Sequence, residues 1–435
     1  MKRVAFYTLG CKVNQYETEA MEEIFQRRGY KVVDIEEESD IYVINTCTVT
    51  NLSDRKSRQF IRRAKRANED AIVVAVGCYS QVAPEEVESI EGVDIVIGTT
   101  ARDKIVDLCE EVMENRQKIN IVKNIKGHKD FENLNIVDLK SKTRAYIKIQ
   151  EGCNQFCSYC IIPYARGPIR SRALEDIVKE TKRLAKAGFK EIILTGIHVA
   201  SYGKDLDGMD LLTVIDEVAK VEGIERIRLS SIEPTLIDEE FMTRAVANKK
   251  LCDHFHLSLQ SGSDRVLKRM NRKYTTGEYK NIVKLIRRYM PDAGITTDII
   301  VGFPGETDEE FEESYQFVKD IRFSRVHVFK YSPRKGTPAS KFKEQIHGNV
   351  KNSRSEKLTL LSEEMMDDFN EKHIGETVEV LFEEENKDDK GYMEGYTTNY
   401  IRVKAEGQED IKGKILPVRI IGKENDILVG KIEEL

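Results

Sequence analysis

The chain has 435 residues, 40% of them hydrophobic and 33% charged, which indicates a globular protein of two or three domains. No apolar run is long enough to span a bilayer, and the N-terminus lacks the apolar core and cleavage site of a signal peptide. We therefore expect a cytoplasmic protein with no membrane partner. The formal net charge of −6 argues against a surface that coats DNA but allows a local basic surface for RNA.

Residues 1–140 are expected to form an open parallel α/β sheet, because apolar strand-like runs alternate with helical patterns. The expected strands are Arg3–Leu9, Asp40–Asn45, Ala71–Val76 and Val93–Ile97, and the expected helices include Glu17–Arg28 and Asp54–Ala67. The second of these helices carries a basic stripe of Arg55, Arg58, Arg62 and Arg66, widened by Lys56, Arg63 and Lys65. Almost no acidic residues interrupt the stripe, which favours phosphate contact over a merely solvated face.

Each of the first three strands leads into a cysteine, and these are Cys11, Cys47 and Cys78. Loops at the carboxyl ends of parallel strands converge on one edge of a sheet, so we expect the three thiols to meet there. Three unrelated buried cysteines are the alternative, since free cysteine packs as a small hydrophobe. The repeated placement favours a three-thiolate [4Fe-4S] cluster with one open iron. Cys109 and Cys252 lack this placement and are interpreted as core residues.

Residues 141–372 contain six strand candidates that alternate with helical stretches, which predicts a partial (β/α)6 barrel. The candidates are Arg144–Gln150, Lys190–His198, Arg226–Glu233, Asp253–Ser261, Ile295–Phe303 and Arg325–Tyr331. After the first come Cys153, Cys157 and Cys160, and this CxxxCxxC spacing is typical of a loop around one [4Fe-4S] cluster. Three thiolates leave one iron open, whereas structural zinc, the alternative, requires a fourth ligand and paired cysteines.

The fourth barrel strand predicts a polar interior. His254, His256, Ser258 and Gln260 share one of its faces, and Phe255, Leu257 and Leu259 share the other. Lys148, Arg228 and Asp298 are candidates for inward positions on other strands. A structural barrel is filled by branched apolar side chains, so polar inward residues indicate a substrate cavity. The pocket candidates are Arg228, His256 and Gln260, with a solvated rim position as the alternative for each.

Glycine-bearing turns end the second and fifth barrel strands, at Gly196 and at Gly302 and Gly305. Glycine allows backbone to approach a ligand closely. Thr307 and Glu310 form a predicted capping box, so a helix starts here with its N-terminal amides facing the strand ends. Beside the cysteine loop, these turns favour a bound cofactor.

Residues 373–435 are expected to form a small OB-like β-barrel, because short strands follow the helical segment Glu356–Lys372. The expected strands are Thr377–Phe382, Tyr392–Thr397, Tyr400–Lys404, Ile411–Ile421 and Leu428–Ile432. Basic residues Arg402, Lys404, Lys414 and Arg419 accompany two aromatic residues, Tyr396 and Tyr400. Bases could stack on these rings, although tyrosine in a strand also serves packing.

In this order the motifs resemble the radical S-adenosylmethionine (SAM) methylthiotransferase family along essentially the whole chain. The matching segments are Leu9–Glu19 (LGCKVNQYETE), Asn45–Cys47, Gly77–Cys78, Gly152–Pro163 (GCNQFCSYCIIP), Leu257–Ser263 and Gly302–Glu306. The opening Gly10-Cys-Lys-Val-Asn-Gln15 and the segment Gly167–Arg172 are similar to the branch that acts on N6-threonylcarbamoyladenosine. The resemblance implies transfer of a methylthio group to carbon 2 of this nucleoside, beside the anticodon in the tRNA stem-loop.

The resemblance also assigns cofactors and partners. It implies that Cys153, Cys157 and Cys160 hold a [4Fe-4S] cluster that passes an electron to SAM, and that Cys11, Cys47 and Cys78 hold a second [4Fe-4S] cluster that delivers sulfur. Another SAM supplies the methyl group, so SAM has two roles. The implied SAM-binding residues are Gly196, Gly302, Gly305 and Tyr159, although Tyr159 could equally serve packing. The further partners implied are tRNA, a sulfur donor and an electron donor such as flavodoxin or ferredoxin.

Two rival hypotheses remain open at this point. The same chemistry could act on N6-isopentenyladenosine in tRNA or on a ribosomal protein, because the substrate assignment depends on short local patterns. A rival of another class is a non-catalytic iron–sulfur protein that senses redox state. It would bind RNA through the small barrel of residues 373–435, which resembles a TRAM module.

Overall fold

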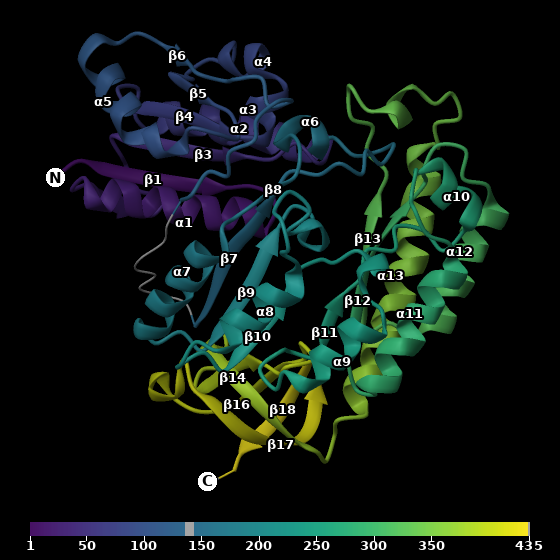
Figure 1. Cartoon of the computed structure of the whole chain (residues 1–435). Helices are drawn as coiled ribbons and strands as arrows, with labels where there is room; N and C mark the ends of the chain where they lie inside the picture. Colours follow the sequence, from purple (N-terminus) through teal and green to yellow (C-terminus); the bar gives the residue numbers. More distant parts are fainter. Residues whose placement is uncertain (135–142, 434–435) are drawn as a thin grey trace.

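The computed structural model describes residues 1–134 and 143–433, which form three packed parts (Figure 1). An N-terminal sheet lies against one side of a central open barrel, and a C-terminal barrel lies against the other. The expected boundary between residues 140 and 141 falls outside the described residues.

Within residues 1–134 a six-stranded parallel sheet has the order β2-β1-β3-β4-β5-β6. Its strands are β1 (Arg3–Thr8), β2 (Lys31–Val33), β3 (Ile41–Thr46), β4 (Ile72–Gly77), β5 (Ile95–Ile97) and β6 (Ile119–Asn120). Its helices are α1 (Lys12–Arg27), α2 (Asn51–Ala67), α3 (Cys78–Val82), α4 (Pro84–Glu88) and α5 (Ile105–Asn115). The expected parallel sheet is confirmed, and the short strands β2 and β6 are added to it.

Both faces of this sheet are buried, which explains its continuous apolar strands. On β3, Val43 packs with α1 and α5, and the next residue, Ile44, packs with α2 on the opposite face. Cys109 of α5 is part of the first core, as expected. Helix α1 starts at Lys12, earlier than the expected Glu17, because Val13 already faces the core.

The central part forms an open barrel from two hydrogen-bonded sheets, β10-β9-β7-β8 and β11-β12-β13. Its strands are β7 (Arg144–Glu151), β8 (Arg170–Ser171), β9 (Glu191–Gly196), β10 (Arg226–Leu229), β11 (His254–His256), β12 (Gly294–Val301) and β13 (Arg325–Lys330). Its helices are α6 (Ile162–Arg166), α7 (Leu174–Lys186), α8 (Leu211–Ala219), α9 (Glu239–Ala247), α10 (Asp264–Arg269), α11 (Thr276–Tyr289), α12 (Asp308–Ile321) and α13 (Gly348–Glu371). Isolated parallel bridges at Ile227–Leu251 and Ile232–Leu257 connect the two sheets.

The expected partial barrel is confirmed, with the expected strands β7, β9, β10, β11, β12 and β13 in chain order. The fourth strand is shorter than expected, since only His254–His256 is regular within Asp253–Ser261. Beyond it, Gln260 has a φ of +74°, a left-handed conformation that interrupts a strand, and keeps only an isolated bridge to Ile299.

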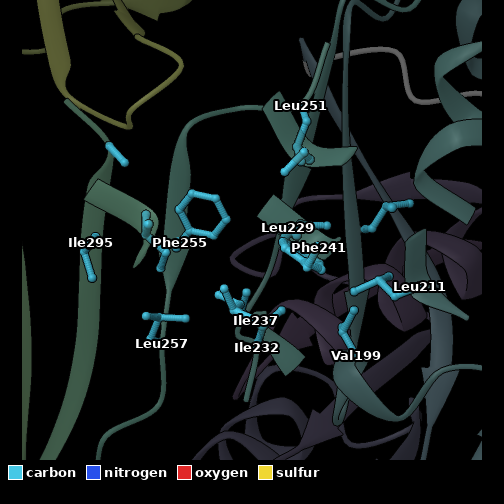
Figure 2. Packing of buried hydrophobic residues seen from close by; sticks show 14 of the residues in the cluster. Val199, Leu211, Leu229, Ile232, Ile237, Phe241, Leu251, Phe255, Leu257 and Ile295 are labelled. Atoms are coloured by element: carbon cyan, nitrogen blue, oxygen red, sulfur yellow. The ribbon is translucent and has the colours of Figure 1, made fainter. Parts of the chain in front are cut away.

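The core of the central part lies between the strands and their covering helices (Figure 2). Phe255, Leu257 and Leu259 are buried there, which confirms the apolar face expected for the fourth strand. Figure 2 shows Phe255 and Leu257 beside Ile295 of β12. Burying each such side chain stabilises the fold by roughly 1.5–3 kcal/mol.

Within residues 373–433 five strands close into a barrel in the order β14-β15-β16-β18-β17. They are β14 (Thr377–Glu385), β15 (Tyr392–Tyr396), β16 (Arg402–Glu406), β17 (Ile415–Glu424) and β18 (Ile427–Ile432). The small barrel is confirmed, but β16 and β17 begin later than the expected Tyr400 and Ile411. Tyr400 has a φ of +73°, and Glu409–Ile411 forms a 3-10 turn, so neither segment is extended.

Two arginines of β10 attach this C-terminal barrel to the central part. Arg226 donates to the carbonyl oxygens of Tyr396 and Glu379, both at 3.0 Å. Arg228 donates to those of Thr398 and Thr397, at 2.8 and 3.0 Å.

Among the described residues, none of the helices is long and apolar enough to cross a bilayer.

Candidate active site

The structure brings Cys11, Cys47 and Cys78 to the carboxyl edge of the N-terminal sheet. Cys11 precedes α1, Cys47 follows β3, and Cys78 follows β4 as the first residue of α3. A Cβ atom on Gly10 would lie 3.1 Å from Cys47 Sγ, and Gly10 has a φ of +111°. Glycine is therefore required for the Cys11 loop to pass so close to the Cys47 thiol. Burial, together with the charges of Cys47 and Cys11, raises the pKa of Cys78 to about 12, although Arg166 opposes this.

Cys153, Cys157 and Cys160 occupy the loop that follows β7. A Cβ atom on Gly152 would lie 1.8 Å from the carbonyl oxygen of Pro168, so only glycine fits where this loop begins. Burial raises the pKa of Cys153 to about 11 and that of Cys160 to about 12, and the neighbouring thiols add to both shifts. Arg272 donates from Nη1 to Cys157 Sγ at 3.5 Å.

Each group offers three thiols, the donor set expected for a [4Fe-4S] cluster with one open iron. Among the described residues, no three His, Cys, Asp or Glu side chains converge on a single metal ion. A cubane cluster does not need such convergence, because each thiolate binds a different iron. The raised thiol pKa values mean that iron binding must displace protons, as metal binding to cysteine generally does. Both groups therefore fit the cluster chemistry.

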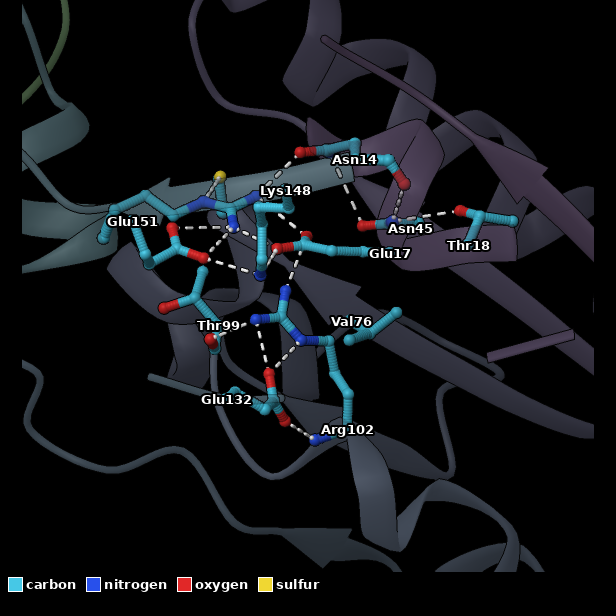
Figure 3. Close-up of polar contacts among 12 residues, drawn as sticks. Asn14, Glu17, Thr18, Asn45, Val76, Thr99, Arg102, Glu132, Lys148 and Glu151 are labelled. Carbon is cyan, nitrogen blue, oxygen red and sulfur yellow. Dashed lines mark hydrogen bonds and ion pairs between the residues drawn. The ribbon is translucent and has the colours of Figure 1, made fainter. Parts of the chain in front are cut away.

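A buried ion network around Glu17 joins the N-terminal part to the central part (Figure 3). Glu17 contacts Arg102 and Arg166 at 2.5 Å and Lys148 at 3.0 Å. Glu151 contacts Lys148 at 2.9 Å and Arg166 at 3.1 Å. Burial alone would raise the pKa of each carboxyl group, but the surrounding cations outweigh burial, and they lower the pKa of Glu151 to about 2.

Arg166 connects this network to a cysteine. It lies at the end of α6, shortly after Cys160, and donates from Nε to Cys78 Sγ at 3.1 Å. It also donates to Asn14 Oδ1 at 2.8 Å. One guanidinium thus links α6, which follows the loop of Cys153 and Cys160, to the thiol of Cys78 in the N-terminal part. Neither Arg166 nor Glu17 could be predicted as a site residue from the sequence, because burial of a charged side chain leaves no periodic pattern.

A cavity of about 820 Å³ lies where the three parts meet. Its wall includes Cys11 and Lys12 from the N-terminal part, Gly196 and His256 from the central barrel, and Tyr400 from the C-terminal barrel. The expected polar interior of the central barrel thus opens onto one thiol of the N-terminal group. This volume is in the range of small-molecule and cofactor sites.

The three pocket candidates differ in their positions. His256 lines the cavity, with Nδ1 at 2.9 Å from Thr296 Oγ1 and Nε2 at 3.3 Å from Asp298 Oδ2. Arg228 and Gln260 are not among the cavity-lining residues. Arg228 is fully buried and pairs with Glu191 at 2.7 Å, in addition to its bonds to the C-terminal barrel. Its observed contacts are therefore with the protein itself.

The expected cofactor residues lie around the cysteine loop and the strand ends. Tyr159 packs against a core cluster that includes Phe303, which agrees with its packing interpretation. Gly196 is the last residue of β9, where a Cβ would lie 2.9 Å from the carbonyl oxygen of Gln150. Gly302 and Gly305 have φ values of +68° and +75°. The expected capping box of Thr307 and Glu310 is present at the start of α12.

Two expected RNA-contacting surfaces are only partly free. On α2, Arg58 pairs with Glu86 and Arg63 with Glu36, while Arg55, Lys56, Arg62 and Arg66 are exposed. On the C-terminal barrel, Arg402 pairs with Glu394 and Lys404 with Glu424, while Lys414 and Arg419 are exposed. The Tyr396 and Tyr400 rings stack on each other, 5.0 Å apart, beneath the Arg144 and Arg228 guanidinium groups.

Comparison with known proteins agrees with this organisation. The Radical SAM superfamily matches residues 147–318, and "Uncharacterized protein family UPF0004" matches residues 3–98. A radical S-adenosylmethionine methyltransferase, TsrM, from Kitasatospora setae, solved with cobalamin and a [4Fe-4S] cluster bound, shares the fold with a TM-score of 0.60. At 15% identity, over 78% of this chain and 77% of that chain, this likeness concerns the fold alone.

Three curated relatives match nearly the full length. The threonylcarbamoyladenosine tRNA methylthiotransferase MtaB of Bacillus subtilis (strain 168) is 46% identical, over 97% of this chain and 94% of its own. The protein of that name from Aquifex aeolicus (strain VF5) is 45% identical, over 96% of this chain and 100% of its own. A tRNA-2-methylthio-N(6)-dimethylallyladenosine synthase from Pelotomaculum thermopropionicum is 36% identical, over 97% of this chain and 96% of its own. The chain therefore belongs to the radical-SAM methylthiotransferase family, on the branch of the MtaB enzymes.

Proposed function

We propose that this protein transfers a methylthio group to carbon 2 of N6-threonylcarbamoyladenosine, beside the anticodon of tRNA, in a SAM-dependent radical reaction. One observation carries the proposal: Cys11 lies on the wall of the central barrel's cavity, in a chain that is 46% identical to a curated enzyme of this name. A sulfur-delivering site and a radical-generating barrel must meet at one substrate atom, and the position of Cys11 on the wall of the barrel's cavity supports such a meeting.

The two cysteine groups have separate roles in this proposal. Cys153, Cys157 and Cys160 hold the [4Fe-4S] cluster that binds SAM, and Cys11, Cys47 and Cys78 hold the second [4Fe-4S] cluster. When bound, the first cluster would supply the electron that cleaves SAM, the second would supply sulfur, and another SAM molecule would supply the methyl group. Tyr159, Gly196, Gly302 and Gly305 form the SAM pocket beside the cysteine loop. The division into residues 1–140, 141–372 and 373–435 follows these roles.

The protein's own residues position the base and keep the groups in place. The adenine leaves the anticodon-loop stack to enter the cavity. There His256, held by Thr296 and Asp298, presents its imidazole edge to the substrate. Arg166 and the Glu17 network fix the Cys78 loop against the central barrel. Walls from all three parts line the cavity, so a bound substrate would displace water from around the reacting atom.

Exposed basic residues contact the tRNA backbone in this proposal. They are Arg55, Arg62 and Arg66 on α2 and Lys414 and Arg419 on the C-terminal barrel, which acts as the TRAM module. An electron donor such as flavodoxin or ferredoxin and a sulfur donor complete the cytoplasmic system, in which neither DNA nor a membrane takes part.

Mass spectrometry of tRNA nucleosides from a deletion strain tests the proposal. We expect the methylthio form of N6-threonylcarbamoyladenosine to disappear and the unmethylthiolated nucleoside to accumulate, while methylthiolated isopentenyladenosine is unchanged. Re-expression of the chain should restore the product, and the Cys153→Ala variant should not. If the methylthiolated isopentenyladenosine disappears instead, the substrate of this protein is isopentenyladenosine. Absence of 5′-deoxyadenosine release by the purified, reduced protein would favour the redox-sensor alternative.

A further inference from the structure

Among the described residues, two cationic side chains on the wall of the cavity form no ion pair with a carboxylate. The carboxylate of Asp298 pairs with His256 at 3.3 Å, and that of Asp426 pairs with Arg402 at 3.8 Å. Within residues 1–134 and 143–433, neither Lys12 nor Arg325 has a carboxylate within ion-pair distance, although both line the cavity. The cavity therefore has spare positive charge, which favours an anionic ligand group.

Lys12 is placed at the junction of the three parts. It is the first residue of α1 and directly follows Cys11. It shares the wall of the cavity with His254 of β11 and His327 of β13, in the central barrel, and with Tyr400 of the C-terminal barrel. Lys12 is half-buried, so its ammonium group is less screened by solvent than a surface lysine would be.

The substrate of the proposed reaction carries a matching group. The threonylcarbamoyl substituent ends in a carboxylate and hangs from N6 of the adenine. In the six-membered ring, the carbon that bears N6 and carbon 2 are separated by one ring nitrogen. A residue that recognises the substituent must therefore lie near the groups that modify carbon 2, and Lys12 adjoins Cys11 there.

We propose that Lys12 determines substrate specificity by binding the carboxylate of the threonylcarbamoyl group with its ammonium group. This inference rests on the proposed function and names the residue that selects this nucleoside. A dimethylallyl or unmodified N6 position has no anion to offer, so Lys12 would remain desolvated without a partner and would disfavour those substrates.

Arg325 is the weaker candidate for this role. It is exposed at the start of β13, where solvent screens its charge and a single ion pair contributes little. It therefore provides a matched control, because it is a second cation on the wall of the same cavity.

Binding of anticodon stem-loop RNA to the full, cluster-loaded chain under anaerobic conditions tests the inference. Fluorescence anisotropy compares an RNA that contains N6-threonylcarbamoyladenosine with the same RNA containing adenosine or the methyl ester of the threonylcarbamoyl group. We expect the wild-type protein to prefer the free carboxylate by about tenfold or more, as for a charge-assisted hydrogen bond. Lys12→Gln should abolish this preference, measured in each protein as the ratio of its affinities for the two RNAs, whereas Lys12→Arg should keep most of it.

Each outcome decides a different claim. Arg325→Gln should change the preference by less than about twofold. If Lys12→Gln binds with the full wild-type preference, or if Arg325→Gln loses it instead, the assignment of Lys12 is wrong. If the wild-type protein itself shows no preference for the N6-threonylcarbamoyladenosine RNA over the adenosine RNA, the proposed function fails. The ester needs no variant, so equal affinity of the wild-type protein for ester and acid would also overturn the role of a cation.

Discussion

Arg166 donates a hydrogen bond from Nε to Cys78 Sγ at 3.1 Å, and the same guanidinium contacts Glu17 at 2.5 Å. The contact crosses from the central barrel to the N-terminal sheet. It places a fixed positive charge beside the Cys78 thiol and so opposes, without reversing, the rise in pKa that burial causes. A residue of α6, the helix that follows the loop of Cys153, Cys157 and Cys160, thus contacts a cysteine of the N-terminal group.

Removing this charge should destabilise the protein and weaken the N-terminal cluster. We expect Arg166→Met to lower the free energy of unfolding by about 3–5 kcal/mol, because Glu17 and Glu151 lose a buried partner. Iron per chain should fall toward half, whereas Arg166→Lys should retain more of both. Thermal unfolding and iron analysis measure the two effects.

Arg63→Met is the matched control, since Arg63 forms an exposed ion pair with Glu36. Its cost should be below about 1 kcal/mol. An Arg166→Met protein with wild-type stability and full iron content would show that the network does not support the cluster.

The same network predicts acid sensitivity. The pKa values of Glu17 and Glu151 are lowered in the folded state by Arg102, Arg166 and Lys148, against the opposing effect of burial. Groups with depressed folded pKa values stabilise the protein above their unfolded pKa, about 4.3 for glutamate, and this stability is lost as pH falls toward the folded value. The denaturant midpoint should therefore fall steeply from about pH 4.5 downward.

Glu17→Gln should lower the midpoint at pH 7 and flatten its dependence on pH below 4.5, because fewer protons are then taken up on unfolding. Denaturation followed by circular dichroism at several pH values measures this, with the exposed Glu38→Gln variant as control. An unchanged acid slope in Glu17→Gln would contradict the assignment.

The two cysteine groups should separate by iron content. Replacing Cys153, Cys157 and Cys160 by alanine should remove about half of the iron and all SAM cleavage, since a [4Fe-4S] cluster needs its thiolates. Replacing Cys11, Cys47 and Cys78 should remove the other half and leave SAM cleavage detectable. Cys252→Ala, a buried core substitution, should retain all iron. If either triple variant kept full iron, its cysteines would not be cluster ligands.

Arg228 should act through the C-terminal barrel. Arg228→Met removes the donors to the carbonyl oxygens of Thr397 and Thr398 and leaves Glu191 buried without its partner. We expect faster proteolysis between α13 and β14 and weaker RNA binding. Lys190→Met, which breaks an exposed pair with Glu225, is the control. If the variant keeps normal protease resistance but loses activity, Arg228 acts in the substrate pocket instead.

The fold and the cysteine placement could be predicted from the sequence because local patterns encode them. Apolar runs in the sequence predicted β1, β3 and β4, and a cysteine follows each run. Parallel topology is therefore enough to bring Cys47 and Cys78 to one edge of the sheet. The expected alternation of the fourth strand holds at Phe255 and His256, since a strand's two faces differ by one residue.

Other features depend on contacts between distant segments and could not be predicted. Glu17 and Arg166 lie far apart in the sequence, and nothing local distinguishes a buried charged residue from an exposed one. The inward position of Arg228 could be predicted, but its partner Thr398 lies in a loop of the C-terminal barrel. Tyr400, whose left-handed conformation delays β16, likewise has its ring 4.7 Å from that of His254 in the central barrel, a contact between distant segments that no local pattern shows.

The most direct test of the account is the product formed by the purified, reconstituted chain on anticodon stem-loop RNA containing N6-threonylcarbamoyladenosine, with methyl-deuterated SAM and a reductant. The account predicts a nucleoside that gains sulfur and a deuterated methyl group at carbon 2, and no such product from either triple-cysteine variant. Unchanged N6-threonylcarbamoyladenosine in the presence of full iron content and active SAM cleavage would contradict it.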